Sequence, residues 1–323
     1  MDGKMIIEKW KNVQAYEIGK LHISRNMVCQ DRTFYKEANG VKIVALADGA
    51  GSKSKSEIGA ELVCEKVCEL FSTKFIDYLL YFEDEKTNQA KHKKNMASLS
   101  KEIITFLVTA LKAKALEMNI AVEELSSTLL FFAIKDNHYI MGHIGDGVIA
   151  GLYNENNAYR VRVISEPENG ERSNITFFVP DTNAAEHLHL QAGSIDNLKG
   201  VLLTSDGAGT VLFNGTSVDD NVYKLFSNFQ NQQHTDYAQV ISKFLREIIS
   251  NYSTDDMSLN ILRLEDADTG KITNNYAEYL LSGVESSKQI IRKSQYCYYI
   301  DPTITATQEF SSIDEVKEYM KWR

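Results

Sequence analysis

Two aspartates open the same tetrapeptide at the ends of two apolar runs. Asp48 follows Val-Ala-Leu-Ala, Asp206 follows Leu-Leu-Thr-Ser, and each begins Asp-Gly-Ala-Gly. Carboxylate oxygens are the ligands that Mg²⁺ and Mn²⁺ prefer, and glycine lets the backbone approach an ion closely. Two such ions ~3.5–4 Å apart can share one carboxylate and hold a hydroxide between them. The repeated tetrapeptide therefore predicts a metal site built at strand ends.

Three further aspartates stand in similar surroundings. Asp146 lies between two glycines, Asp255 lies just before the apolar run at 257–264, and Asp31 precedes a short predicted strand at 33–35. Any single Asp-Gly pair is weak support for a metal site, because Asp-Gly between apolar runs is also the strongest short signal of a hairpin turn. The set supports a metal site more strongly than any one member.

The hairpin alternative applies unequally to these aspartates. Gly145-Asp146-Gly147 lies between two apolar runs and fits a turn as well as a ligand. Asp206 also fits a turn leading into 210–213. Asp48 fits a turn poorly, since a polar Ser/Lys stretch and a helical pattern follow it, and no strand does.

The apolar patterning predicts the elements that must position these residues. Residues 41–47 form a buried strand, and 56–82 form a helix with a capping box at Ser54–Glu57. A solvated connection at 83–98 leads to a second helix from about 99 to 118. The remaining expected elements are strands at 127–134, 139–144, 148–153, 159–164, 200–204 and 257–264, and helices at 218–229 and 237–249. This order favours antiparallel sheet covered by helices over alternating βαβ units.

Composition narrows the functional classes. The 323 residues carry a formal net charge of −9, and an acidic chain is a poor candidate for binding nucleic acid or an anionic membrane. No apolar run reaches the ~20 residues of a membrane span, and the N-terminus does not resemble a signal peptide. The four cysteines match no disulfide framework or zinc ribbon. We therefore expect a cytoplasmic protein.

Six short motifs occur in the order found in one known family. They are Arg25…Gln30-Asp31, Ala47–Ser52 with Ser56–Ala60, Ser127-Thr128-Leu129, Gly142–Gly147, Leu203–Gly207 and Asp255–Ser258. In this they resemble the metal-dependent serine/threonine protein phosphatases of the PPM, or type 2C, family, and Pro167–Glu171 resembles a segment of its bacterial branch. The resemblance covers roughly residues 10–265.

The resemblance implies an α+β fold, a four-layer α/β-β/α sandwich with two central antiparallel sheets flanked by helices. It also implies two Mg²⁺ or Mn²⁺ ions and a more weakly held third. Asp48 would bridge the two ions, with the Gly49 carbonyl on one of them. Asp206 and Asp255 would ligate the other, Asp31 matches the acidic residue of the N-terminal motif, and Asp146 matches the ligand of the third ion. A metal-bridging hydroxide would then hydrolyse phosphoserine or phosphothreonine in a protein substrate, and a cognate serine/threonine kinase would be a partner.

This sequence departs from the family pattern at several positions. Gln30 stands where Glu or Asn is usual, Asp256 stands where Asn is usual, and Ala50 replaces a histidine common in animal and plant members. Arg25, the match to the phosphate-binding arginine, lies six residues before Asp31 where five is usual. The alternative is a weak or inactive phosphatase-fold module that binds a phosphoprotein or regulates a kinase.

The composition becomes polar after residue 264. We therefore expect a phosphatase-type domain at 1–265 and a C-terminal extension at 266–323 with helical ends and no assigned role.

Overall fold

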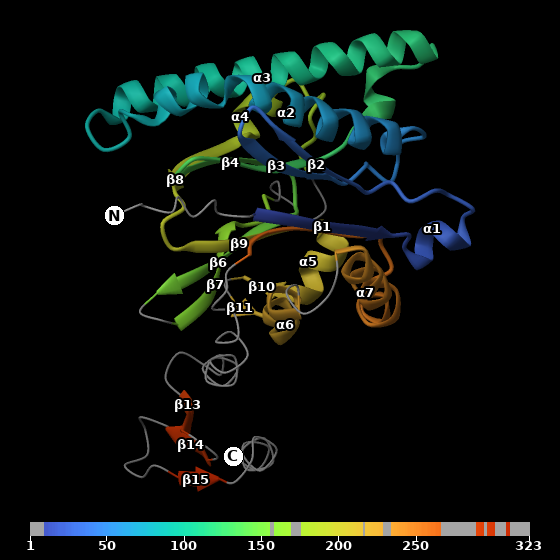
Figure 1. Cartoon of the computed structure of the whole chain (residues 1–323). Helices are drawn as coiled ribbons and strands as arrows, with labels where there is room; N and C mark the ends of the chain where they lie inside the picture. Colours follow the sequence, from blue (N-terminus) through green and yellow to red (C-terminus); the bar gives the residue numbers. More distant parts are fainter. Residues whose placement is uncertain are drawn as a thin grey trace.

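The computed structural model describes residues 10–155, 158–168, 176–215, 217–228, 234–265, 289–293, 296–300 and 308–310. Two five-stranded antiparallel sheets lie face to face at its centre (Figure 1). The first sheet contains, in spatial order, β1 (Trp10–Glu17), β12 (Met257–Leu264), β9 (Leu198–Thr204), β6 (Val148–Glu155) and β7 (Ala158–Ser165).

The second sheet contains β2 (Arg32–Ala38), β3 (Val41–Ala47), β4 (Leu129–Lys135), β5 (His138–Ile144) and β8 (His189–Ser194), in this order. Its outer face is covered by α2 (Ser56–Leu79), α3 (Gln89–Met118) and the short α4 (Ala184–His187).

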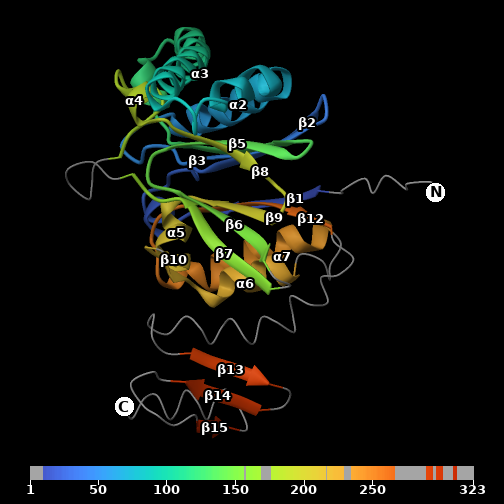
Figure 2. The ribbon, with the colours of Figure 1, turned by 90° about the vertical axis from the view of Figure 1, so that its left-hand side faces the viewer.

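The outer face of the first sheet carries the other helix layer. It consists of α5 (Asp206–Leu212), α6 (Asp220–Asn228) and α7 (His234–Glu247), and Figure 2 shows the resulting four layers edge-on. Strands and helices thus form the predicted α/β-β/α sandwich.

The central strands are apolar on both faces because each face is covered. In β4, Leu129 and Phe131 pack against the α2–α3 layer, whereas Leu130 and Phe132 pack between the two sheets. Successive side chains of a strand point to opposite faces, so a strand buried on both faces appears as a continuous apolar run. This is why the sequence predicted a buried strand at β3 and strands at β4, β9 and β12.

The chain leaves one sheet and enters the other between β5 and β6. These strands do not pair: β5 pairs with β4 and β8, and β6 pairs with β7 and β9. Gly145, in the connection, has a φ of +115°, and a Cβ there would lie 2.5 Å from the Thr128 side chain. The hairpin alternative for Asp146 is therefore wrong, and Asp146 lies at a crossing between sheets. The hairpin alternative for Asp206 is also wrong, because α5 begins at that residue.

Several local predictions were wrong at element boundaries. The helix N-cap is Lys55 without a side-chain cap, and the Ser54 hydroxyl donates instead to Glu124 at 2.7 Å, so no capping box forms. Helix α3 begins at Gln89, inside the segment expected to be a solvated connection, and Asn88 caps it by accepting from Lys91 N–H at 3.0 Å. Strands β1 and β8 were not predicted.

The remaining elements are short. They are α1 (Lys20–Ser24), η1 (Leu80–Phe82), η2 (Val122–Leu125), η3 (Ile249–Asn251), β10 (Phe213–Asn214), β11 (Ser217–Val218), β13 (Gln289–Lys293), β14 (Tyr296–Ile300) and β15 (Gln308–Phe310).

Strands β13, β14 and β15 form a sheet of their own. The helical ends predicted for the C-terminal extension lie outside the described residues, and the boundary at 265/266 stays a prediction. Among the helices that the structure describes, none is both long and apolar enough to cross a bilayer.

Two glycines of α5 provide a matched test of how closely this helix packs against its neighbours. A Cβ on Gly207 would lie 2.0 Å from the Asp256 carbonyl oxygen, whereas a Cβ on Gly209 would meet Thr204 at 3.4 Å, an ordinary contact. We expect Gly207→Ala to lower the free energy of unfolding by ~1–3 kcal/mol through overpacking. Gly209→Ala should be neutral or stabilising, because alanine favours a helix by up to ~1 kcal/mol. Urea denaturation measures both, and equal effects would contradict the packing described here.

Candidate metal centre

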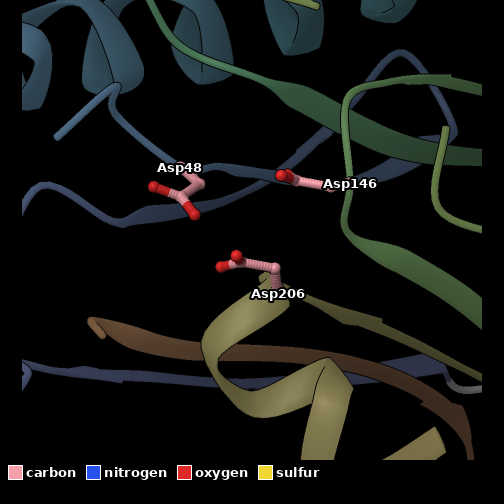
Figure 3. A group of neighbouring side chains, drawn as sticks. All are labelled: Asp48, Asp146 and Asp206. Atoms are coloured by element: carbon pink, nitrogen blue, oxygen red, sulfur yellow. The ribbon is translucent and has the colours of Figure 1, made fainter. Parts of the chain in front are cut away.

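Three carboxylates from distant parts of the chain meet at one end of the sandwich. Asp48 follows β3, Asp146 lies in the crossing from β5 to β6, and Asp206 is the first residue of α5. One carboxylate oxygen from each lies within 4.8 Å of the others. Figure 3 shows the three side chains facing a common space from the two sheets and the helix.

These aspartates line a cleft of about 440 Å³. Asp255, just before β12, also lines it, and Asp255 is exposed. The cleft lining consists of Asp48, Gly49, Ala50, Gly51, Ser52, Thr128, Asp146, Thr176, Phe178, Asp206 and Asp255. Among the residues that the structure describes, this lining contains four carboxylates and no lysine, arginine or histidine, so it is suited to a cation.

Backbone contacts fix the position of Asp48. Its N–H donates to the Thr128 hydroxyl at 2.9 Å, and the Thr128 N–H donates to the Asp48 carbonyl at 2.8 Å. The next residue, Gly49, donates its N–H to the Gln30 carbonyl at 3.3 Å. A Cβ on Gly49 would lie 2.8 Å from the Ser56 side chain and 2.9 Å from the Gln30 carbonyl, so a larger residue does not fit without a shift.

Burial and mutual repulsion disfavour the charged forms of these acids. The pKa of Asp48 is raised well above its usual value by burial and by the charges of Asp31, Asp206 and Asp146. Burial and the charges of Asp146 and Asp255 raise the pKa of Asp206 to about 6. Burial is also the main reason that the pKa of Asp146 is raised, although a hydrogen bond from Thr176 opposes this shift.

Asp31 lies behind this group and is fully buried. Among the residues that the structure describes, neither of its carboxylate oxygens has a hydrogen-bond partner, and one oxygen of Asp206 is likewise buried without a partner. Burial raises the pKa of Asp31 to about 7, while the nearby hydroxyls of Ser205 and Ser258 act in the opposite direction. Unpartnered buried acceptors are costly, and a bound cation would satisfy them.

The structure places Arg25 apart from the cleft lining. It forms the C-cap of α1, its side chain is exposed, and it is not among the residues that line the cleft. Its role in binding phosphate stays a prediction.

Asp256 and its partners were missed as part of the site by sequence reasoning. Its buried carboxylate accepts from Gly19 N–H at 2.7 Å, from Gln30 N–H at 2.5 Å and from His22 Nδ1 at 2.8 Å. It thereby ties the start of β12 to the segment that carries Asp31. These partners are more than 220 residues away in sequence. The only sign of this position in the sequence was that Asp256 stands where the family usually has Asn.

Two histidines next to the cleft, His187 and His189, share one carboxylate partner. Glu168 contacts His187 Nδ1 at 2.9 Å and His189 Nε2 at 3.1 Å, and Phe177 stacks on the His187 ring at 3.4 Å. Phe177 lies between Thr176 and Phe178, which line the cleft. The histidines therefore anchor a cleft-forming segment.

The sequence is similar to that of a known family over most of the chain. The family model described as protein phosphatase 2C matches residues 18–246 of the 323-residue chain. Serine/threonine-protein phosphatase 3 of Escherichia coli (strain K12) is 26% identical over 185 residues, which are 55% of this chain and 66% of that relative. The match thus spans slightly less than two thirds of the relative's length.

Solved structures share the fold at low sequence identity. A bacterial serine phosphatase has a TM-score of 0.53 and 13% identity, covering 80% of this chain and 100% of its own. A serine/threonine phosphatase of Staphylococcus aureus has a TM-score of 0.52 and 13% identity, covering 82% of this chain and 100% of its own. Because the family model spans well over half of the sequence and the sandwich is the same, the chain belongs to the protein phosphatase 2C family.

Proposed function

We propose that this chain is a Mg²⁺- or Mn²⁺-dependent phosphatase that hydrolyses phosphoserine and phosphothreonine in proteins. The observation that carries the proposal is the convergence of Asp48, Asp146 and Asp206 in a protein phosphatase 2C chain. The names of the Escherichia coli and Staphylococcus aureus relatives support the substrate class. On this proposal the chain acts in cytoplasmic signalling, opposite a serine/threonine kinase.

The residues present fit hard divalent cations. Within the described part of the cleft, carboxylates with unpartnered oxygens and no basic neighbour form a set that a divalent ion would neutralise. Asp48 would bridge two ions with the Gly49 carbonyl on one, and Asp206 and Asp255 would ligate the other. Asp31 would be a further metal ligand, and Asp146 would hold a third ion.

Bound ions would supply positive charge to the phosphoryl oxygens and lower the pKa of a bound water. The chain's own contribution is to hold the ligands in place. Thr128 fixes the backbone of Asp48, and Thr176 donates to the carboxylate of Asp146. Phe178 closes part of the cleft wall.

An inactive binding module is the second candidate, and one observation favours it. Arg25, the predicted phosphate ligand, is exposed and lies outside the cleft lining. On this alternative the same cleft would bind a phosphoprotein or regulate a kinase without hydrolysis.

Removing a proposed ligand tests activity and metal binding together. With Mn²⁺ present, we expect the natural chain to hydrolyse p-nitrophenyl phosphate and a phosphoserine peptide. Asp48→Asn and Asp206→Asn should each lose at least about 100-fold in kcat/KM, as when an electrostatic group is removed from a reacting centre. Calorimetry should show weakened Mn²⁺ binding in both variants.

Asp77→Asn, on the exposed face of α2, serves as the control and should change neither quantity. An inactive natural chain that still binds phosphopeptide would instead favour the binding module. Unchanged Mn²⁺ affinity in both Asp48→Asn and Asp206→Asn would contradict the proposed metal site.

The raised pKa of Asp31 predicts a pH dependence of the metal-free protein. An Asp carboxyl has a pKa of about 3.9 when unfolded, and that of Asp31 is about 7 when folded. Folding therefore favours the protonated acid, so its contribution to stability is present below pH ~4 and is lost as pH rises towards ~7. In EDTA, Asp31→Asn should gain Tm relative to the natural chain between pH 4.5 and pH 7.5, as thermal melts would show. A difference in Tm that does not change with pH would contradict this.

Arg25→Ala tests phosphate recognition separately. If Arg25 binds the phosphoryl group, its removal should raise KM for phosphopeptide about tenfold, as expected for a charge-assisted hydrogen bond worth ~1.5 kcal/mol. Mn²⁺ affinity should stay unchanged. An unchanged KM would exclude Arg25 from the site.

A further inference from the structure

His22 is a histidine held rigidly next to the cleft. It lies in α1, its side chain is only 5% exposed, and its Nδ1 lies 2.8 Å from the Asp256 carboxylate. The same carboxylate oxygen accepts from Gln30 N–H, and the Gln30 carbonyl accepts from Gly49 N–H, beside Asp48. A buried carboxylate that accepts from Nδ1 fixes the orientation of the ring.

The second ring nitrogen lies near Gly51, a residue that lines the cleft, although His22 itself is not one of the lining residues. Nε2 has no hydrogen-bond partner among the described residues, and it is not one of the fully enclosed polar atoms. A Cβ built on Gly51 would lie 3.8 Å from this nitrogen, and Gly51 lines the cleft. Because glycine has no side chain, nothing on Gly51 covers Nε2.

Among the described residues that line the cleft, none is a histidine, lysine or arginine that could protonate a departing alkoxide. Its acidic groups are the four aspartates proposed as ligands. The Thr128 hydroxyl accepts from Asp48 N–H, and the Thr176 hydroxyl donates to Asp146. A seryl or threonyl alkoxide is a poor leaving group, and a positioned general acid accelerates such a step by ~10²–10⁴-fold.

We propose that His22, positioned by Asp256, is the general acid for the leaving oxygen of the substrate. This rests on the proposed phosphatase function. A water oxygen, having lost a proton to solvent, bonds to phosphorus as the phosphorus–oxygen bond to the side chain breaks. The departing oxygen takes the bonding electron pair and the Nε2 proton, which leaves the serine or threonine hydroxyl. His22 then regains a proton from solvent.

Substrates with different leaving groups test this role. Nitrophenolate departs readily without a proton, whereas a seryl alkoxide does not. In His22→Gln, we expect kcat for a phosphoserine peptide to fall at least about tenfold more than kcat for p-nitrophenyl phosphate, both measured with Mn²⁺. His138→Gln, an exposed histidine at the opposite end of β5, is the matched control and should not change this ratio.

A second variant guards against loss of folding. Gly51→Val adds atoms over Nε2 and leaves the His22–Asp256 contact in place, and it should shift the same ratio in the same direction. Thermal melts and Mn²⁺ calorimetry of both variants report whether the fold and the metal site survive.

The other outcomes separate this role from the proposed function. Equal losses on both substrates, or a change in KM alone, would overturn the general-acid role while leaving the phosphatase intact. No turnover of either substrate by the natural chain would overturn the proposed function, and the acid role with it.

Discussion

The carboxylates of Asp48, Asp146 and Asp206 repel one another, and the rest of the fold must hold them together against this repulsion. Their oxygens lie within 4.8 Å of one another, and the charged forms are disfavoured by burial and by neighbouring charge. Two sheets with apolar layers on every face provide a rigid frame, since a close-packed interior deforms little. Each aspartate is attached where a strand of this frame ends, so the repulsion cannot be relieved by moving one side chain far.

The segment that precedes β12 connects the central sheets to the region around α1 and Gln30. Asp255 faces the cleft, while its neighbour Asp256 turns inward and accepts hydrogen bonds from the segment around α1 and Gln30. Gly19 packs directly on Asp255, where a Cβ would lie 2.2 Å from the Asp255 carbonyl carbon. This segment therefore fixes the positions of both the proposed ligand Asp255 and the His22 side chain.

Two edge strands of the central sheets that the sequence missed, β1 and β8, have a weak apolar pattern. In β1 only Trp10 and Val13 are buried, and in β8 no residue is fully buried. The first turns of α3 were missed for a related reason, because they are polar and exposed. Edge strands and solvated helix ends are stabilised by pairing and capping, which leave little trace in hydrophobic periodicity.

The sequence by itself determined the aspartates, the glycines beside them and the buried strands at whose ends they stand, since strand periodicity and Asp-Gly pairs are local features. It left open whether Asp146 and Asp206 formed turns, and it did not reveal that His187 and His189 share a partner. Tertiary structure decided these points: it placed Asp146 at a crossing between sheets, brought Glu168 to both histidines and joined His22 to Asp256. Such contacts depend on which strands pair and in what order, and no local pattern of residues encodes that order.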